Sequence, residues 1–136
     1  HPMAHGDYAF YRSHYQERTT DVTIATGTQN YANVLTSRSA NHQLWIQKIT
    51  LSITTHAAQT ITIDDDGSGP PIAAHTDAAA GAGVPSVVTW DFGPKGRPLT
   101  IGANVDIGQS AAGIGGVLHI EAYEKIAIPM AIGSNN

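Results

Sequence analysis

The segment from Leu44 to Thr54 constrains the fold more than any other part of the sequence. It is rich in β-branched residues and contains neither glycine nor proline, which is typical of a β-strand. Its apolar residues first occupy even positions, as Leu44 and Ile46 do. They then occupy odd positions, as Leu51 and Ile53 do. Because one extra residue reverses the two faces of a strand, this pattern predicts a long strand with a bulge or a crossing between two sheets.

Shorter segments of the same kind fill most of the remaining chain. Turn signals separate them about every eight to twelve residues, and no helical period persists beyond a turn or two. About eight strands with long loops between several of them predict an all-β, antiparallel β-sandwich of the jelly-roll type. Besides Leu44 to Thr54, the expected strands are 20–26, 59–63, 72–75, 87–92, 99–101, 105–107 and 117–124, with a weaker alternation over 31–35. The expected core residues are Ile49, Leu51, Ile53, Ile61, Ile63, Val88, Leu118 and Ile120.

The chain is expected to contain one folded domain. Its 136 residues suffice for a single core and fall short of two. Residues 1–19 are interpreted as an N-terminal arm, 20–125 as the β-sandwich, and 126–136 as an apolar C-terminal tail. Met3 has the position of a natural start, so His1 and Pro2 are interpreted as a remnant of an expression vector.

Charge and composition exclude several classes of function. Lys and Arg number only seven and the net charge is −4, so the chain lacks the clustered cations that nucleic-acid binding requires. There is no cysteine for disulfides or thiolate chemistry, and no apolar run long enough to span a membrane. Charged residues make up 13 %, about half the usual share. Such a surface favours coverage by another chain, although Thr, Ser, Asn and Gln could instead keep it soluble.

The sequence predicts no enzyme and no cofactor. The run Asp64–Gly67 lacks the spacing of an EF-hand, so a solvated loop is favoured over a calcium site. The seven histidines lack the paired spacing of a metal-binding jelly roll, and no nucleophile motif is present. Trp45 and Trp90 could stack on sugars, but tryptophans within strands more often pack in a core or an interface.

The first nineteen residues carry an unusual share of the aromatic side chains. Two readings are open: an arm that lies on another surface, or a first strand packed on its own domain. We favour the arm, with aromatic anchors and arginines at the rim of the contact. The expected interface residues are Tyr8, Phe10, Tyr11, Arg12, Tyr15 and Arg18.

Several stretches between about residues 42 and 125 resemble small tailed-phage virion proteins. The family is that of the head decoration (cement) proteins and closely related head and tail accessory proteins. The stretches that carry the resemblance are Ile46–Thr55, Thr60–Asp65, Thr89–Gly96, Leu99–Thr100 and Gly116–Lys125.

The resemblance implies a jelly-roll or β-sandwich subunit without catalytic residues. It implies a homo-oligomer, with a trimer favoured by analogy, that is made in the host cytoplasm and sits on the capsid exterior. There it would clamp neighbouring major capsid proteins, and many weak contacts on one lattice would add by avidity. The alternative is a receptor- or carbohydrate-binding jelly-roll module of a phage tail, or a lectin-like protein.

Overall fold

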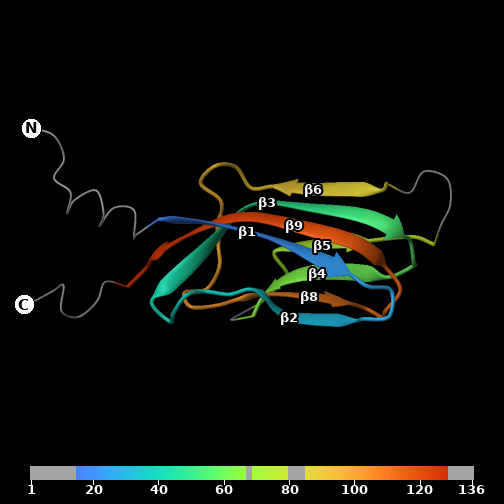
Figure 1. The fold of residues 1–136 in the computed structure, drawn as a ribbon, viewed down its shortest axis with the longest axis horizontal. Helices are drawn as coiled ribbons and strands as arrows, with labels where there is room; N and C mark the ends of the chain where they lie inside the picture. The colour runs from blue at the N-terminus through green and yellow to red at the C-terminus, as the bar shows by residue number, and fades with distance from the viewer. Residues whose placement is uncertain (1–14, 67–68, 80–84, 129–136) are drawn as a thin grey trace, which may run out of the picture.

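The described part of the chain consists of strands, turns and loops. The computed structural model describes residues 15–66, 69–79 and 85–128, and these ranges contain nine strands and no helix (Figure 1). The strands are β1 (Gln16–Ile24), β2 (Asn30–Leu35), β3 (His42–Thr55), β4 (Thr60–Asp65), β5 (Ala73–Thr76), β6 (Val87–Asp91), β7 (Arg97–Pro98), β8 (Val105–Gln109) and β9 (Gly115–Ile126).

The strands form two antiparallel sheets with the topology of a jelly roll. One sheet has the order β1-β9-β3-β6, with β7 also beside β3, and the other has the order β2-β8-β4-β5. Four pairs are nested along the chain: β4 with β5, β3 with β6, β2 with β8, and β1 with β9. Rolling such a nested hairpin into two layers brings β9 beside β3 and β8 beside β4. The predicted fold class is confirmed.

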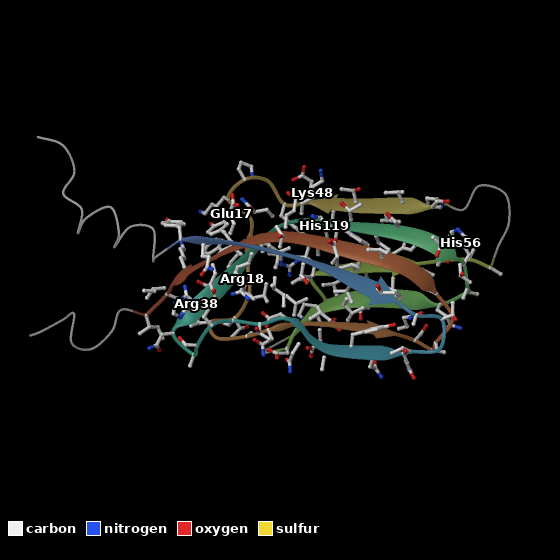
Figure 2. The ribbon with its side chains drawn as sticks, viewed as in Figure 1. Glu17, Arg18, Arg38, Lys48, His56 and His119 are labelled. Carbon is white, nitrogen blue, oxygen red and sulfur yellow. The ribbon has the colours of Figure 1, made fainter. Side chains whose placement is uncertain are left out.

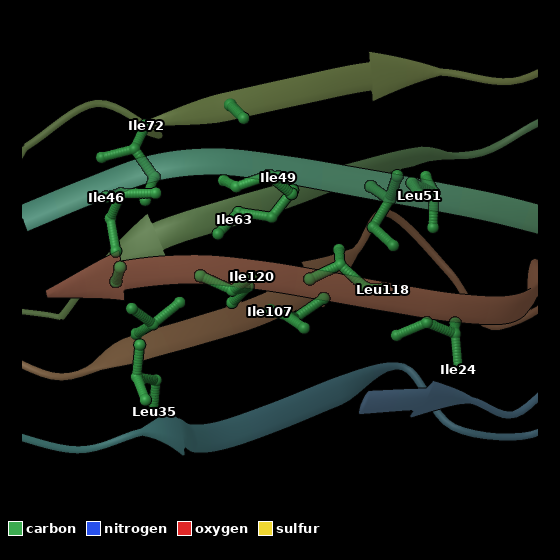
Figure 3. Packing of buried hydrophobic residues seen from close by; sticks show 14 of the residues in the cluster. Ile24, Leu35, Ile46, Ile49, Leu51, Ile63, Ile72, Ile107, Leu118 and Ile120 are labelled. Atoms are coloured by element: carbon green, nitrogen blue, oxygen red, sulfur yellow. The ribbon is translucent and has the colours of Figure 1, made fainter. Parts of the chain in front are cut away.

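The core lies between the two sheets. Ile49 and Ile120 from the first sheet face Ile63 and Ile107 from the second, and none of these side chains is exposed by more than 2 % (Figure 3). Seven of the eight expected core residues are buried. Val88 is only half-buried and packs against the core from β6, which is an edge strand with a single neighbour, β3.

The change of parity within the long strand is a β-bulge. Ile46 pairs with Ala122 of β9, whereas Lys48 pairs with Glu121, so Gln47 is an extra residue. Because the bulge reverses the faces of β3, Ile46 before it and Ile49 after it are both fully buried. The predicted face switch is confirmed, and of its two predicted causes the bulge is the one observed.

Two differences from the sequence-based expectations are larger than one or two residues at a strand end. β1 begins at Gln16, so residues 16–19, expected in the arm, belong to the first sheet, where they pair with β9. The expected strand at 99–101 is wrong, because the strand there is β7 and the chain then turns. Leu99 is 2 % exposed and its backbone N–H donates to the Leu44 carbonyl oxygen at 2.9 Å, so this residue is held against β3 just after β7 ends.

Candidate interaction surface

The residues expected to form an interface fall into two groups. Tyr8, Phe10, Tyr11 and Arg12 lie outside the described residues. Tyr15 and Arg18 are described: Tyr15 directly precedes β1, and Figure 2 labels Arg18 at the end of the molecule where β1 begins. They have different surroundings.

Arg18 contacts the interior of its own domain. Its Nη1 donates to Glu124 Oε1 at 2.7 Å, and its Nη2 donates to the Thr36 carbonyl oxygen at 2.9 Å. Glu124 is 1 % exposed and also accepts a hydrogen bond from the backbone N–H of Arg38 at 2.7 Å. Arg18 therefore ties the β2–β3 loop to the first sheet.

Sequence reasoning missed Glu124, although a signal for it was present. The alternation that places Leu118, Ile120 and Ala122 inside the sandwich also places position 124 inside. Because a buried carboxylate requires partners, the inward parity of Glu124 predicts a basic or N–H donor nearby. Only the folded chain identifies that donor, which lies 106 residues away.

Tyr15 belongs to a partly exposed aromatic cluster, which we call the aromatic ladder: Tyr15, Tyr123 and Trp45. The ring centroids of Tyr15 and Tyr123 are 5.9 Å apart, and those of Tyr123 and Trp45 are 6.0 Å apart. The last two residues pair directly across β9 and β3, and this register makes the stack possible. Lys125 Nζ lies 4.6 Å from the Trp45 ring centre and 5.8 Å from that of Tyr15, within cation–π range.

The ladder is anchored at its centre. The Tyr123 hydroxyl donates to the Lys95 carbonyl oxygen at 2.8 Å, and burial followed by the proximity of Tyr15 raises the pKa of Tyr123. Tyr15 is 45 % exposed, so the ladder presents apolar surface to solvent at its outer end.

A hollow lies beside the ladder. Its volume is about 380 Å³ and its lining combines aromatic and polar side chains. Two of the polar groups are already engaged: Gln47 Nε2 donates to the Pro94 carbonyl oxygen, and Gln16 Oε1 accepts from Arg38. The lining residues are Tyr15, Gln16, Glu17, Gln47, Pro94 and Tyr123. Such a hollow can accept a flat group, and its lining also includes the Glu17 carboxylate and two amide side chains.

The outer face of the first sheet is polar and carries charges of both signs. The strand register places Lys48 between Glu121 and Asp91, and His119 Nδ1 lies 2.5 Å from Asp21. His119 and Asp21 are 38 % and 70 % exposed, so solvent screens this pair. This face therefore carries charges, although the sequence as a whole contains few charged residues.

The acidic run and the tryptophans have mainly structural surroundings. Asp65 Oδ2 accepts from the backbone N–H and the hydroxyl of Thr100, and Asp66 Oδ1 accepts from the backbone N–H of Asn104. These two carboxylates hold the loop before β8 in place through hydrogen bonds. The sequence predicts only a solvated loop for this acidic run. Trp90 packs against the core, whereas Trp45 stacks in the aromatic ladder.

Within the described ranges, no group of three or more His, Asp or Glu side chains could hold a metal ion. A helix long and apolar enough to cross a membrane is also absent from that part of the chain.

Comparison with known proteins identifies the fold class. The sequence matches no protein-family model and no curated protein sequence. A chain of the acid-stable capsid of the Helicobacter pylori bacteriophage KHP30 is similar in structure, with a TM-score of 0.53 and 12 % identity over 82 % of this chain and 88 % of that one. This likeness establishes a shared all-β sandwich fold.

Two further structures are similar at lower scores. One is a chain of the virus-like particle of the extra small virus of the prawn Macrobrachium rosenbergii: TM-score 0.41, 14 % identity, covering 81 % of this chain and 79 % of that one. The other comes from Bacillus endospore appendages, which form disulfide-linked pili. Its TM-score is 0.44 and its identity 16 %, over 82 % of this chain and 87 % of that one. These scores are too low to establish a common fold.

Proposed function

We propose that this chain is a structural subunit of a virus particle. The observation that carries the proposal is the likeness to the phage KHP30 capsid chain, which extends over most of both chains. The jelly roll is a fold that viral capsids use repeatedly, although lectins and cupins use it too. The buried carboxylates of the domain make internal contacts, as Glu124 does with Arg18. This fits a structural role better than a catalytic one.

Its place in the particle is that of a decoration (cement) protein. Copies bind the exterior of the capsid and stabilise contacts between major capsid proteins. The aromatic ladder supports this role, because aromatic side chains bury large areas at a small cost in conformational entropy. The charges of both signs on the outer face of the first sheet would set orientation more than affinity.

Binding to capsids tests the decoration role. Capsids of the virus that encodes the chain, prepared without it, are incubated with the purified protein and sedimented. Saturable co-sedimentation at a fixed ratio of copies to capsid protein supports the proposal. Absence of binding contradicts the decoration role, and assembly of the protein alone into closed shells would make it the shell subunit.

The second part of the proposal is self-association as a trimer. Light scattering at micromolar concentration measures the mass, and a monomer contradicts self-association. The number three depends on analogy with jelly-roll decoration proteins alone.

The N-terminal arm is proposed to contact a neighbouring subunit or the capsid. Since β1 begins at Gln16, the arm ends earlier than residue 19, and its last aromatic residue, Tyr15, is part of the ladder. Deletion of residues 4–14 should leave the circular dichroism spectrum of the sandwich unchanged and weaken capsid binding or oligomerisation. A truncated protein that fails to fold would show that this segment belongs to the core, and one that binds fully would exclude it from the interface.

Carbohydrate binding is a second candidate function, favoured by the hollow beside Tyr15 and Tyr123. Aromatic rings next to amide and carboxylate groups are a composition that sugars can use. A glycan array tests it, with Tyr15→Ala as the variant that should lose any signal. Binding by both proteins, or by neither, contradicts a sugar site at the hollow.

A further inference from the structure

A buried carboxylate lies between two histidines at the opposite end of the sandwich from the aromatic ladder, where Figure 2 labels His56. The Asp77 side chain has no exposed surface. His56 Nδ1 is 3.0 Å from Asp77 Oδ2, and His75 Nε2 is 3.5 Å from Asp77 Oδ1. The side chain of His56 is 15 % exposed and that of His75 is 16 % exposed, so both rings are largely buried.

The cluster connects two segments that are distant in the sequence. His56 lies in the turn between β3 and β4, whereas Asp77 directly follows β5. The Asp77 carboxylate accepts a hydrogen bond from the backbone N–H of Ala57 at 3.1 Å, and the Asp77 N–H donates to the Gln59 carbonyl oxygen at 2.9 Å. The carboxylate thus ties the β3–β4 turn to the end of β5.

The charge of Asp77 has few groups to balance it. In the described ranges its ion pairs involve only His56 and His75, and no lysine or arginine pairs with it. On β4, the residue opposite His75 is the apolar Ile61, and the β8–β9 loop contributes Gly113, which packs on Ala57. An isolated buried charge is costly, and in the described ranges the two imidazoles are the groups that can supply positive charge here.

The two histidines differ in their contacts with Asp77. His56 Nδ1 is within hydrogen-bond distance of both carboxylate oxygens. His75 Nε2 is a buried nitrogen without a hydrogen-bond partner among the described residues, although it faces the same carboxylate. A neutral imidazole carries one N–H and a protonated imidazole carries two, so proton uptake adds both a donor and a charge here.

We propose that Asp77, His56 and His75 form a proton-operated clasp that holds the β3–β4 turn against the end of β5 more tightly in mild acid than at neutral pH. Burial of the rings opposes their charging, but a carboxylate within hydrogen-bond distance favours it. Repulsion between two imidazolium rings limits the gain mainly to one proton.

Thermal unfolding of the full chain at pH 7.5 and pH 5.5, at constant ionic strength, tests the clasp. The variants are His56→Gln and His75→Gln. The matched control is His42→Gln, because His42 Nδ1 contacts the Ser39 hydroxyl and forms no ion pair among the described residues. All variants retain His119, so its contribution to the pH dependence of the melting temperature is the same in each and cancels in the comparison.

On acidification, the wild type and His42→Gln should change in melting temperature alike. Between pH 7.5 and pH 5.5, the change in melting temperature of His56→Gln should be about 3 °C less favourable than theirs, the shift expected from a single modest interaction. The change in melting temperature of His75→Gln on acidification should also be less favourable than that of the wild type. Equal pH responses in His56→Gln and His42→Gln would overturn the proposal.

Amide hydrogen exchange gives a local readout that a general loss of stability would not imitate. After correction for the intrinsic effect of pH, protection of the Ala57 amide should rise several-fold between pH 7.5 and 5.5 in the wild type. It should stay constant in His56→Gln. Constant protection in the wild type, with the protein folded at both pH values, would also overturn the clasp.

Discussion

The guanidinium of Arg18 and the carboxylate of Glu124 form an ion pair of 2.7 Å in which the Glu124 side chain is only 1 % exposed. The pair connects β1 to β9 at the end of the molecule where the aromatic ladder also lies. Arg18 was expected at the rim of an interface, and the sandwich itself uses this side chain. Its main effect should therefore be on stability.

Arg18→Ala should lower the free energy of unfolding by about 3 kcal/mol, because it leaves a buried carboxylate without its counter-charge. Urea unfolding measures the change. Arg38→Ala is the matched control, since its guanidinium makes an exposed contact with Gln16 and only its backbone N–H reaches Glu124. The control should change stability by about 0.5 kcal/mol or less. Equal losses in the two variants would contradict a special role for Arg18.

Leu51→Ala should cost about 2–5 kcal/mol, since Leu51 is completely buried between the sheets and the substitution leaves a cavity. Val87→Ala serves as the control, because Val87 is 57 % exposed on the edge strand β6. Its cost should stay within about 0.5 kcal/mol. A loss near zero for Leu51→Ala would mean that the two faces of β3 are assigned the wrong way round.

Gly116→Ala should destabilise the protein by about 3 kcal/mol, the upper end of the usual cost of overpacking. A Cβ at this position would overlap the carbonyl oxygen of Ser52 in the neighbouring strand β3, and a backbone atom paired in a sheet cannot move aside. Gly27→Ala is the control, because a Cβ there meets no atom within 4 Å. Chemical denaturation of both variants measures the contrast, and similar midpoints would contradict the close approach of β9 to β3.

Asp77 should make the protein sensitive to strong acid. Burial alone raises its pKa, but hydrogen bonds from His56 and from the backbone of Ala57 and Ala78, with the charge of His56, lower it below the ordinary value of 3.8. A carboxyl whose pKa is lowered on folding stabilises the protein above its unfolded pKa, and this contribution is lost as the pH falls through the folded pKa. The stability difference between wild type and Asp77→Asn should therefore shrink as the pH falls below about pH 4. A difference that does not depend on pH would contradict this assignment.

The sequence by itself determined the strands, their faces and the fold class. Period-two alternation is a local property, so it located seven of the eight expected core residues and the reversal of faces within β3. It failed at Leu99 because a strand and an inward turn place the same apolar side chain in the core, and only packing decides between them. The expected interface could be followed only at Tyr15 and Arg18, the two members that lie in the described ranges.

Only the tertiary structure decided which distant residues meet. The aromatic ladder joins Tyr15, Trp45 and Tyr123 from three segments, and Glu124 meets Arg18 across 106 residues. Asp77 faces His56 because the nested pairing of β3 with β6 and β4 with β5 brings a turn and a strand end together. Alternation specifies the face of the sheet to which a side chain points, but the register between strands specifies its partner, and that register is set by the packing of the whole sandwich.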